Sequence, residues 1–285
     1  MFVAGIKLLM CCHKQYEIIP PMFEPILCGA EFHDASEWDI ADNIGDNISH
    51  KNREYCELTA HYYAWKNETA EYYGFCHYRR FFCSPESTDM AYLTKGRLND
   101  KASKRLLGSE EYWRSLIESY DIIVPRSEDM GLAAREHYVT SAFHYSEDLQ
   151  LFLEIMDGKA PFLSDVAEEY LCQNRQYFCN MFIMDKKHFF EYCEILFDIL
   201  DEFDNRKTRH GDFQADRTDG YLGEIFTGIY INHCRRSGAK IMEVPRLDVF
   251  CGLKKRMVYL LMPPESSRRF LAKKIVKKIK GKQNA

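Results

Sequence analysis

The stretch YYGFCHYRRFF, residues 72–82, decides how the rest of the sequence is interpreted. Its first part, YYGFC, has the apolar and aromatic character of a short buried strand. His77, Arg79 and Arg80 follow at once. Because an unpaired buried guanidinium is costly, such a cluster is either neutralised by acidic partners or kept for an anionic ligand. In open α/β sheets, ligands gather at the carboxyl ends of strands, where this segment is expected to lie.

Strand-like runs recur on both sides of this segment, separated by stretches with helical periodicity. The runs are GIKLLMCC (5–12), PILCG (25–29), YDIIVP (120–125), FCNMFIM (178–184) and AKIMEVP (239–245). We expect one helix after NIGDNISHKN, with Tyr55, Leu58 and Tyr62 on one face, and further helices over 186–203 and 220–234. The polar stretch between Ser84 and Arg105 predicts a mobile loop or lid. This alternation favours an α/β fold with a mostly parallel sheet flanked by helices.

Charge is distributed unevenly along the chain. Of 38 basic and 43 acidic residues, 11 basic and one acidic lie from Lys254 onward, which leaves 27 basic and 42 acidic residues and a net charge of −15. An acidic body argues against general nucleic-acid binding. With no internal repeat and no linker before residue 252, we expect one domain over residues 1–251 and a basic C-terminal tail over 252–285.

The tail has amphipathic character. RRFLAKKIVKKIK (268–280) places Leu271, Ile275, Val276 and Ile279 on one helical stripe with lysines around the rest. The alternative is a solvated, disordered basic end. An apolar stripe flanked by lysines suits an anionic membrane surface, which we therefore expect as a partner.

The cysteine pattern and the N-terminal sequence indicate the cellular compartment of the protein. The 11 cysteines include no Cys-x-x-Cys pair and are interpreted as reduced thiols. MFVAGIKLLMCC is interrupted by Lys7 and is interpreted as a first strand, not a signal peptide. No stretch approaches the roughly 20 apolar residues of a membrane-spanning helix. Together with the tail, these features predict a cytoplasmic protein, peripheral on the inner face of the cell membrane.

Two polar segments are candidates for binding a ligand. His77, Arg79 and Arg80 suit a diphosphate, because a guanidinium matches phosphate oxygens with two hydrogen bonds, and the alternative is a structural ion-pair network. The segment ADNIGDNISHKN (41–52) presents polar side chains around a glycine turn, where they could bind sugar hydroxyls or a nucleotide, or simply form an Asx turn and a helix cap. The candidate residues of this segment are Asn43, Asp46, Asn47 and Asn52.

Two carboxylates and one amide complete the set of candidates. Asp219 and Glu224 surround a helix start in DGYLGEIF, and either could act as a general base or belong to a solvated helix face. Asn180 is polar among apolar neighbours and needs a hydrogen-bond partner, either ligand or backbone. No Gly-x-Gly-x-x-Gly, Walker or Gly-x-Ser-x-Gly motif is present, and Asp-x-Asp, the usual metal-diphosphate motif of GT-A transferases, is also missing.

The sequence as a whole resembles a bacterial family, the domain of unknown function 4422. The resemblance runs from about Lys7 to Pro245 and is carried by five ordered blocks: residues 42–67, YYGFCHYRRFF, YDIIVP, CNMFIMDKKHFFEYCEILFDIL and GYLGEIFTGIYI. A further signature of the family, with Arg217, Gly220 and Glu224 here, is matched with one extra residue after Phe213. The resemblance implies a single GT-A-like nucleotide-sugar transferase domain, encoded with capsular polysaccharide and exopolysaccharide genes.

This resemblance implies transfer of a sugar from a nucleoside-diphosphate donor, such as UDP-galactofuranose or UDP-galactose, to a lipid-linked saccharide in capsular, exopolysaccharide or O-antigen synthesis. His77, Arg79 and Arg80 would stand where Asp-x-Asp usually sits and would replace the metal, so no cofactor is predicted and no metal ligand is assigned. Dependence on Mn²⁺ or Mg²⁺ stays an alternative. Glu224 is the expected catalytic carboxylate, with Asp219 second.

Two other classes of protein are alternatives. A non-catalytic, membrane-associated assembly factor could bind an anionic glycolipid with the same arginines. An RNA-binding module could stack bases on Tyr78, Phe81 and Phe82, but the acidic body disfavours it. Release of UDP from a UDP-sugar separates the enzyme from both.

Overall fold

Strand β3 (Tyr72–His77) lies at the centre of the sheet because it pairs on both edges and at its end. β1 (Ile6–Cys12) runs parallel along one edge, and β9 (Phe182–Asp185) runs antiparallel along the other. β4 (Arg80–Phe82) folds back as a hairpin in which His77 faces Arg80. This computed structural model describes residues 5–16, 18–84, 90–94, 105–209, 217–250, 257–258, 261–262 and 266–272.

The remaining strands extend the sheet from these neighbours. β2 (Phe23–Leu27) runs parallel to β1, β6 (Ile122–Pro125) is antiparallel to β9, and β10 (Ile241–Val244) is parallel to β6. β11 (Arg246–Phe250) pairs with β4, and β5 (Met90–Thr94) runs parallel to β11. Within the described residues, only β4 and β9 of the nine strands point against the others. The predicted mostly parallel sheet is confirmed.

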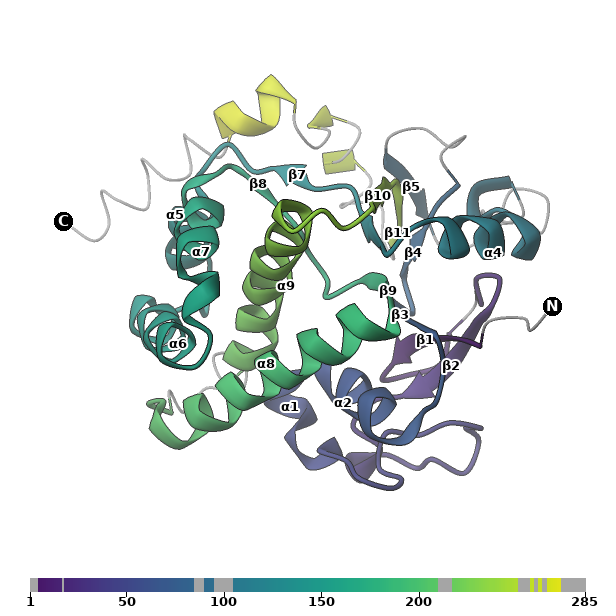
Figure 1. The fold of residues 1–285 in the computed structure, drawn as a ribbon. Helices are drawn as coiled ribbons and strands as arrows, with labels where there is room; N and C mark the ends of the chain where they lie inside the picture. Colours follow the sequence, from purple (N-terminus) through teal and green to yellow (C-terminus); the bar gives the residue numbers. More distant parts are fainter. Residues whose placement is uncertain are drawn as a thin grey trace.

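Side chains from the two faces of the sheet pack into two separate hydrophobic cores. On β1, Leu9 and Cys11 enter the larger core, whereas Leu8 and Met10 enter the smaller one, as the two-residue period of a strand requires. The helices α2 (Leu58–Asn67), α8 (Lys186–Arg206) and α9 (Thr218–Arg236) cover the first face, and α4 (Glu110–Ser119) covers the second (Figure 1). The predicted α/β arrangement with flanking helices is therefore confirmed.

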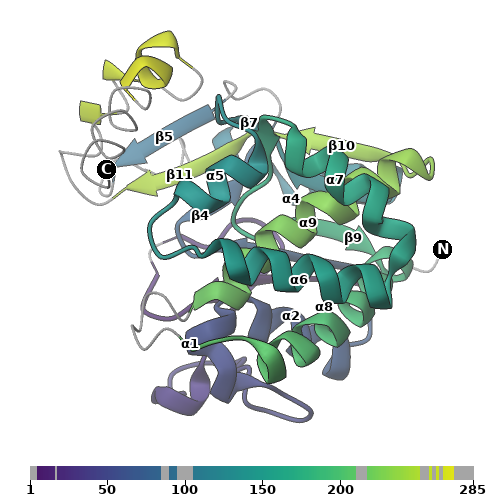
Figure 2. The ribbon, with the colours of Figure 1, turned by 90° about the vertical axis from the view of Figure 1, so that its left-hand side faces the viewer.

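A second helical layer packs outside α8 and α9. It contains α5 (Ala134–Thr140), α6 (Ser146–Lys159), the 3₁₀ helix η3 (Pro161–Leu163) and α7 (Ser164–Cys172), in front of α9 in Figure 2. A small ribbon of β7 (Glu128–Asp129) and β8 (Arg175–Gln176) borders this layer. Three short helices follow β2 along the chain: η1 (Ala30–Phe32), η2 (Ser49–Lys51) and α1 (Asn52–Tyr55).

The structure differs from the sequence-based predictions in two places. The single helix expected after NIGDNISHKN is broken at Cys56, whose φ of 53° ends α1 before α2 begins. In the stretch predicted as a loop or lid, Met90–Thr94 forms strand β5, while residues 85–89 and 95–104 lie outside the described residues. α8 and α9 are helices where they were expected.

The tail is described only in part. Residues 267–272 are helical, and the ring of Phe270 packs directly against Gly131, where a Cβ atom would lie 2.7 Å from Phe270 Cδ1. Residues 273–280, which carry most of the expected amphipathic stripe, lie outside the described residues. None of the helices described here has the length and apolar character needed to cross a membrane.

Asp42 holds together the segments that follow β2. Its fully buried carboxylate accepts hydrogen bonds from the N–H groups of Gly29 and Ala30 at 2.7 and 2.9 Å. The hydroxyls of Ser49 and Thr59 donate to the same carboxylate at 2.5 and 2.6 Å. A buried carboxylate with four donors replaces its lost hydration, so one side chain fixes the end of β2, the start of η2 and the first turn of α2.

We predict that Asp42→Asn lowers the free energy of unfolding by about 3 kcal/mol, because hydrogen bonds to a buried charged group are lost and the new amide NH₂ faces donors. Asp39→Asn is the matched control, since Asp39 is exposed three residues away and should change stability by less than about 0.5 kcal/mol. Urea denaturation followed by circular dichroism measures both. Equal stability of the two variants would contradict the role of Asp42.

Candidate functional site

A cleft of about 920 Å³ opens where β1 and β3 end. Cys11 and Cys12 come from the end of β1, and His77 and Tyr78 from the end of β3. The other residues that line it are His13, Lys14, Cys28, Phe32, His33, Asn52, Arg53, Cys56, Glu57, Arg79, Arg80, Arg217, Tyr221 and Glu224. The carboxyl edge of parallel strands is the expected ligand position in an α/β sheet.

The cations of the cleft differ in how far they are neutralised. Arg80 Nε lies 3.2 Å from Asp248 Oδ1 on β11. Arg79 is exposed at the hairpin turn and contacts the ring of Tyr78, whereas Arg217 Nε donates to the Cys56 thiol at 3.2 Å. Within the part of the chain that the structure describes, Arg79 and Arg217 have no carboxylate at ion-pair distance. These two guanidiniums are therefore the ones most available to an anion.

His77 lies in the cleft as a neutral side chain. Burial, followed by the positive charges of Arg80 and Arg79, lowers the pKa of His77 well below its usual value. Its Nδ1 atom is buried and has no hydrogen-bond partner among the described residues. As a neutral imidazole, His77 adds no positive charge to the cleft at neutral pH.

Two carboxylates face the same cleft. Glu224 comes from α9, and Arg217, the N-cap residue of that helix, lines the cleft with Tyr221 and Glu224 at spacings of four and three residues. Burial and the negative charge of Glu57 raise the pKa of Glu224 to about 7. Burial also raises the pKa of Glu57. A carboxylate that titrates near neutral pH in a cleft is suited to take a proton from a substrate.

Glycines on α9 bring these carboxylates together. A Cβ atom on Gly220 would lie 3.0 Å from Cys56 Sγ, and one on Gly223 would lie 2.8 Å from Leu58 Cδ1. Only the absence of both side chains lets α9 approach the break between α1 and α2 this closely. Glu57, between Cys56 and Leu58, is thereby set beside the helix that carries Glu224.

Asn52 is the one predicted residue of the 41–52 segment that lines the cleft. Its Nδ2 donates to the Cys56 carbonyl at 2.7 Å and to Thr59 Oγ1 at 3.0 Å, bonds that span the break between α1 and α2. The structure places the other three residues elsewhere. Asp46 and Asn47 belong to a turn tied to Asn67 and Tyr62 at the end of α2, and Asn43 is exposed.

Asn180 lies behind the wall of the cleft and is almost completely buried. Its Nδ2 donates to the Gly220 carbonyl at 3.2 Å and to Glu57 Oε1 at 3.4 Å, and its Oδ1 accepts from Thr227 at 3.3 Å. The partner that this amide needed is therefore protein. Its contact with Glu57 connects it to the cleft indirectly.

Asp219 does not line the cleft. It is two residues from Arg217, about 200° around the helix, so its side chain points to the other side of α9. There Lys207 Nζ lies 2.6 Å from both Asp219 and Asp204 and 3.0 Å from Glu54. Burial raises the pKa of Asp219 to about 7, and Lys207 opposes the rise. Of the described side chains, this carboxylate trio has metal-ligand spacing, and Lys207 supplies its cation.

Sequence reasoning missed Glu57. In the single helix that the sequence predicted, Glu57 is an ordinary polar residue beside Leu58. The position of Glu57 in the cleft depends on the positive φ of Cys56. Position 56 is not a glycine or an asparagine, the residues that usually adopt a positive φ, so the sequence gives no sign that the helix breaks there. Arg217 was noted only as part of a signature, although its spacing from Tyr221 and Glu224 already predicts a shared helical face.

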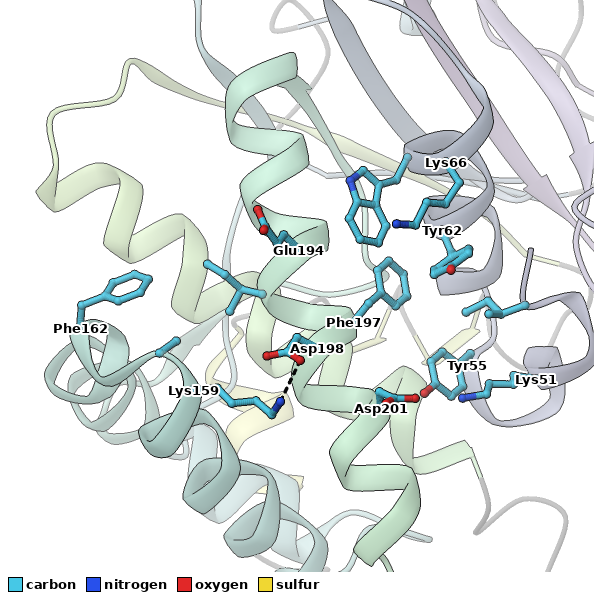
Figure 3. A pocket seen from close by; sticks show the side chains of 14 residues that line it. Lys51, Tyr55, Tyr62, Lys66, Lys159, Phe162, Glu194, Phe197, Asp198 and Asp201 are labelled. Atoms are coloured by element: carbon cyan, nitrogen blue, oxygen red, sulfur yellow. Dashed lines mark hydrogen bonds and ion pairs between the residues drawn. The ribbon is translucent and has the colours of Figure 1, made fainter. Parts of the chain in front are cut away.

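A second cavity of about 610 Å³ lies between α2 and α8 (Figure 3). Its wall is aromatic, with Trp65 stacked on Phe197 at a centroid distance of 5.8 Å. Two of its lysines are already neutralised, since Lys159 lies 2.8 Å from Asp198 and Lys51 lies 2.7 Å from Asp204. None of the described residues that line this cavity is an arginine, so the cleft is the better candidate for binding an anion.

Comparisons with known proteins concern the family and the fold. No curated protein matches the sequence. Among solved structures, the chain is similar to the apo form of WbbM, a bifunctional glycosyltransferase, with 29% sequence identity and a TM-score of 0.79. The match covers 86% of this chain and 45% of that chain, so this chain spans less than half of its structural neighbour. The profile of one family, the domain of unknown function DUF4422, matches residues 7–236. The chain therefore belongs to the DUF4422 family.

Proposed function

We propose that the protein is a glycosyltransferase that moves a sugar from a nucleoside-diphosphate donor, such as UDP-galactofuranose or UDP-galactose, to a saccharide acceptor. The observation that carries the proposal is the cleft itself, in which available guanidiniums and carboxylates with raised pKa values face one cavity. The similarity to WbbM supports it. A lipid-linked acceptor of capsular, exopolysaccharide or O-antigen synthesis fits the family resemblance.

The proposed roles follow from charge and availability. Arg79 and Arg217 bind the donor diphosphate, Arg80 contributes a charge shared with Asp248, and His77 donates a hydrogen bond. In a direct displacement, the acceptor oxygen attacks the anomeric carbon while its proton passes to Glu224. The bond from the anomeric carbon to the diphosphate oxygen breaks, and its electron pair leaves with the diphosphate, whose growing charge the guanidiniums stabilise.

Not all candidate residues enter this proposal. Asn52 stays a candidate for contact with the donor, because it lines the cleft. Asn43, Asp46, Asn47 and Asn180 stay predictions without a contact to the cleft, and Asp219 stays a secondary one behind its ion pair with Lys207. Cations in place of Asp-x-Asp favour a reaction without metal.

A direct test is a ligand-detected NMR screen of nucleotide sugars against the purified protein, followed by an assay for UDP release with and without acceptor glycans. We expect a UDP-hexose to bind and to release UDP, with most activity kept in EDTA. Binding of anionic glycolipid without any UDP release would favour the non-catalytic assembly factor instead. Complete loss of release in EDTA, restored by Mn²⁺, would refute the metal-free reaction.

Arg79→Ala and Arg217→Ala should each lower kcat/KM by about two orders of magnitude, because charge-assisted contacts to a leaving diphosphate are worth about 2–4 kcal/mol in the transition state. UDP affinity, measured by calorimetry, should fall in both variants. Arg114→Ala, which removes a partly exposed arginine of α4 paired with Glu110, is the matched control. Unchanged UDP affinity in both cleft variants would show that the donor diphosphate does not bind at Arg79 and Arg217.

Glu224→Gln should bind the donor normally yet turn over at least 100-fold more slowly, because the amide cannot accept the acceptor's proton. In the parent enzyme the base must be ionised, and its pKa is about 7, so kcat/KM should rise as pH increases through about 7. Initial rates over pH 5–9 measure this limb. Parental rates in Glu224→Gln would assign the base elsewhere.

We also propose that the tail holds the protein on an anionic membrane surface. Met257, Val258, Leu261 and Leu271 are each between 45% and 60% exposed, in a segment where basic residues greatly outnumber acidic ones. Exposed apolar side chains among lysines and arginines suit the boundary between lipid headgroups and acyl chains. Phe270 against Gly131 joins this segment to the body.

Deleting residues 266–285 should release the protein from vesicles containing anionic phospholipid while UDP binding stays unchanged. Raising the salt concentration should release the full-length protein in part, because it screens the lysines. Leu271→Glu should weaken sedimentation with vesicles, whereas Ile44→Glu, at an equally exposed position of the body, should not. Equal sedimentation of full-length and truncated protein would exclude the tail as the membrane contact.

A further inference from the structure

Glu57 and Glu224 are held by neighbouring residues of one turn. The Cys179 N–H donates to Glu224 Oε1 at 2.7 Å, and Asn180 Nδ2 donates to Glu57 Oε1 at 3.4 Å. Cys179 and Asn180 have φ values of 77° and 47°, in the left-handed region that residues with a Cβ atom seldom adopt. Such strain persists only where the surrounding structure imposes it. A single strained turn therefore fixes the two carboxylates relative to each other.

A buried network holds the turn in place. Thr227 donates to Asn180 Oδ1 and to the Gly223 carbonyl, and its hydroxyl lies 3.0 Å from the Tyr192 hydroxyl. Asn180 also donates to the Gly220 carbonyl. The amide of Asn180 thus has a fixed orientation, with its NH₂ group toward Glu57. This arrangement ties Glu57 to the helix that carries Glu224 by two independent routes, through the glycines and through Asn180.

Charges around the pair favour one ionised carboxylate over two. Arg80 and Arg217 act on Glu57, and Arg80 and Arg246 act on Glu224, but Arg80 and Arg246 also pair with Asp248. The thiols and phenols near the pair are neutral at pH 7: Cys11, Cys28, Cys56, Cys179, Tyr170, Tyr192 and Tyr221. Lys14, Arg53 and Arg79 are the further charged groups among the described residues that line the same cleft. Two carboxylates in one partly buried site repel each other, so a proton taken up by one stabilises the other.

We propose that Glu57 and Glu224 form a proton-sharing pair, in which Glu57 stays the anion held by Asn180 and Glu224 carries the exchangeable proton. The role in transfer rests on the proposed function. There, the acceptor's O–H proton moves to Glu224 as the new carbon–oxygen bond forms and the bond to the diphosphate breaks. Glu57 touches no reacting atom. It is a positioning residue whose negative charge makes Glu224 a stronger base.

The test is the titration of Glu224 in the parent protein and in Glu57→Gln, which keeps an oxygen for Asn180 and removes the charge. Carbon-13 NMR of carboxyl-labelled glutamate follows each group, and loss of one resonance in Glu224→Gln assigns it. We expect a Glu224 midpoint near 7 in the parent and about one pH unit lower in Glu57→Gln, because a neighbouring negative charge has been removed. The acid limb of kcat/KM should move by the same amount.

Two controls separate charge from structure. Glu57→Asp keeps the charge and should leave the Glu224 midpoint close to the parental value, and Glu111→Gln removes an exposed carboxylate of α4 and should change nothing. In the parent protein itself, the Glu57 resonance should show a small inflection at the Glu224 midpoint, a readout that needs no variant at this site.

The outcomes also separate this inference from the proposed function. A Glu224 midpoint that stays in place in folded Glu57→Gln, together with no inflection at Glu57 in the parent, would overturn the pair whether or not the protein transfers sugar. A moved midpoint in a protein that releases no UDP from any donor would support the pair and overturn the transferase proposal alone.

Discussion

The close packing of α9 against the break between α1 and α2 is the constraint on which the candidate site depends. Gly220 and Gly223 leave no room for a side chain, so the backbone of α9 packs directly against the side chains of Cys56 and Leu58. At a wider spacing, Glu224 and Arg217 would not reach the cavity that Glu57 lines. The positive φ of Cys56 serves the same contact, because it lets the chain turn beneath α9 and start α2 with Glu57 at its N-cap.

Charge in the cleft is organised by the same packing. Burial makes both carboxylates weaker acids, and their mutual repulsion adds to the effect at Glu224. The β3–β4 hairpin carries Arg79 and Arg80, and of these two only Arg80 is paired with Asp248 on β11. The result is a cavity in which cations available to an anion lie near a group that takes up a proton at neutral pH. These are the two requirements of transfer from an anionic leaving group to a hydroxyl.

The sequence was informative where local pattern alone determines structure. The strands β1, β3 and β6 and the helices α8 and α9 follow from hydrophobic periodicity, and His77, Arg79 and Arg80 were expected at the cleft because β3 is buried and ends there. The polar residues of the 41–52 segment could not be sorted in this way. Asn43, Asp46, Asn47 and Asn52 look alike beside a glycine turn, but only Asn52 faces the cleft, because Asp42 anchors the surrounding segments. That anchor joins residues far apart along the chain, and no local pattern reveals it.

Cys56 is a second position where contacts between residues far apart in the sequence determine the structure against the local pattern. Residues 52–67 have a good helical pattern, and the break in it is imposed by α9, about 160 residues later in the chain. Glu57 becomes a cleft residue only through that contact. For Asp219, in contrast, the sequence alone was sufficient. Its spacing from Arg217 and Glu224 along the helix places it on another face, where it pairs with Lys207. At about 100° per residue, Arg217 and Glu224 fall on one face of the helix and Asp219 on another. Closeness in sequence alone would wrongly place all three residues in the same site.

The negative charge of the body affects how anions approach both the cleft and the tail. With a net charge of −15 outside the tail, the body repels anionic ligands, so an anion gains attraction only close to the guanidiniums at the β3–β4 hairpin. The basic tail offsets part of that repulsion and gives an anionic surface one favourable segment to contact. Local placement of positive charge, not net charge, therefore determines which anions this protein can approach, and from which side.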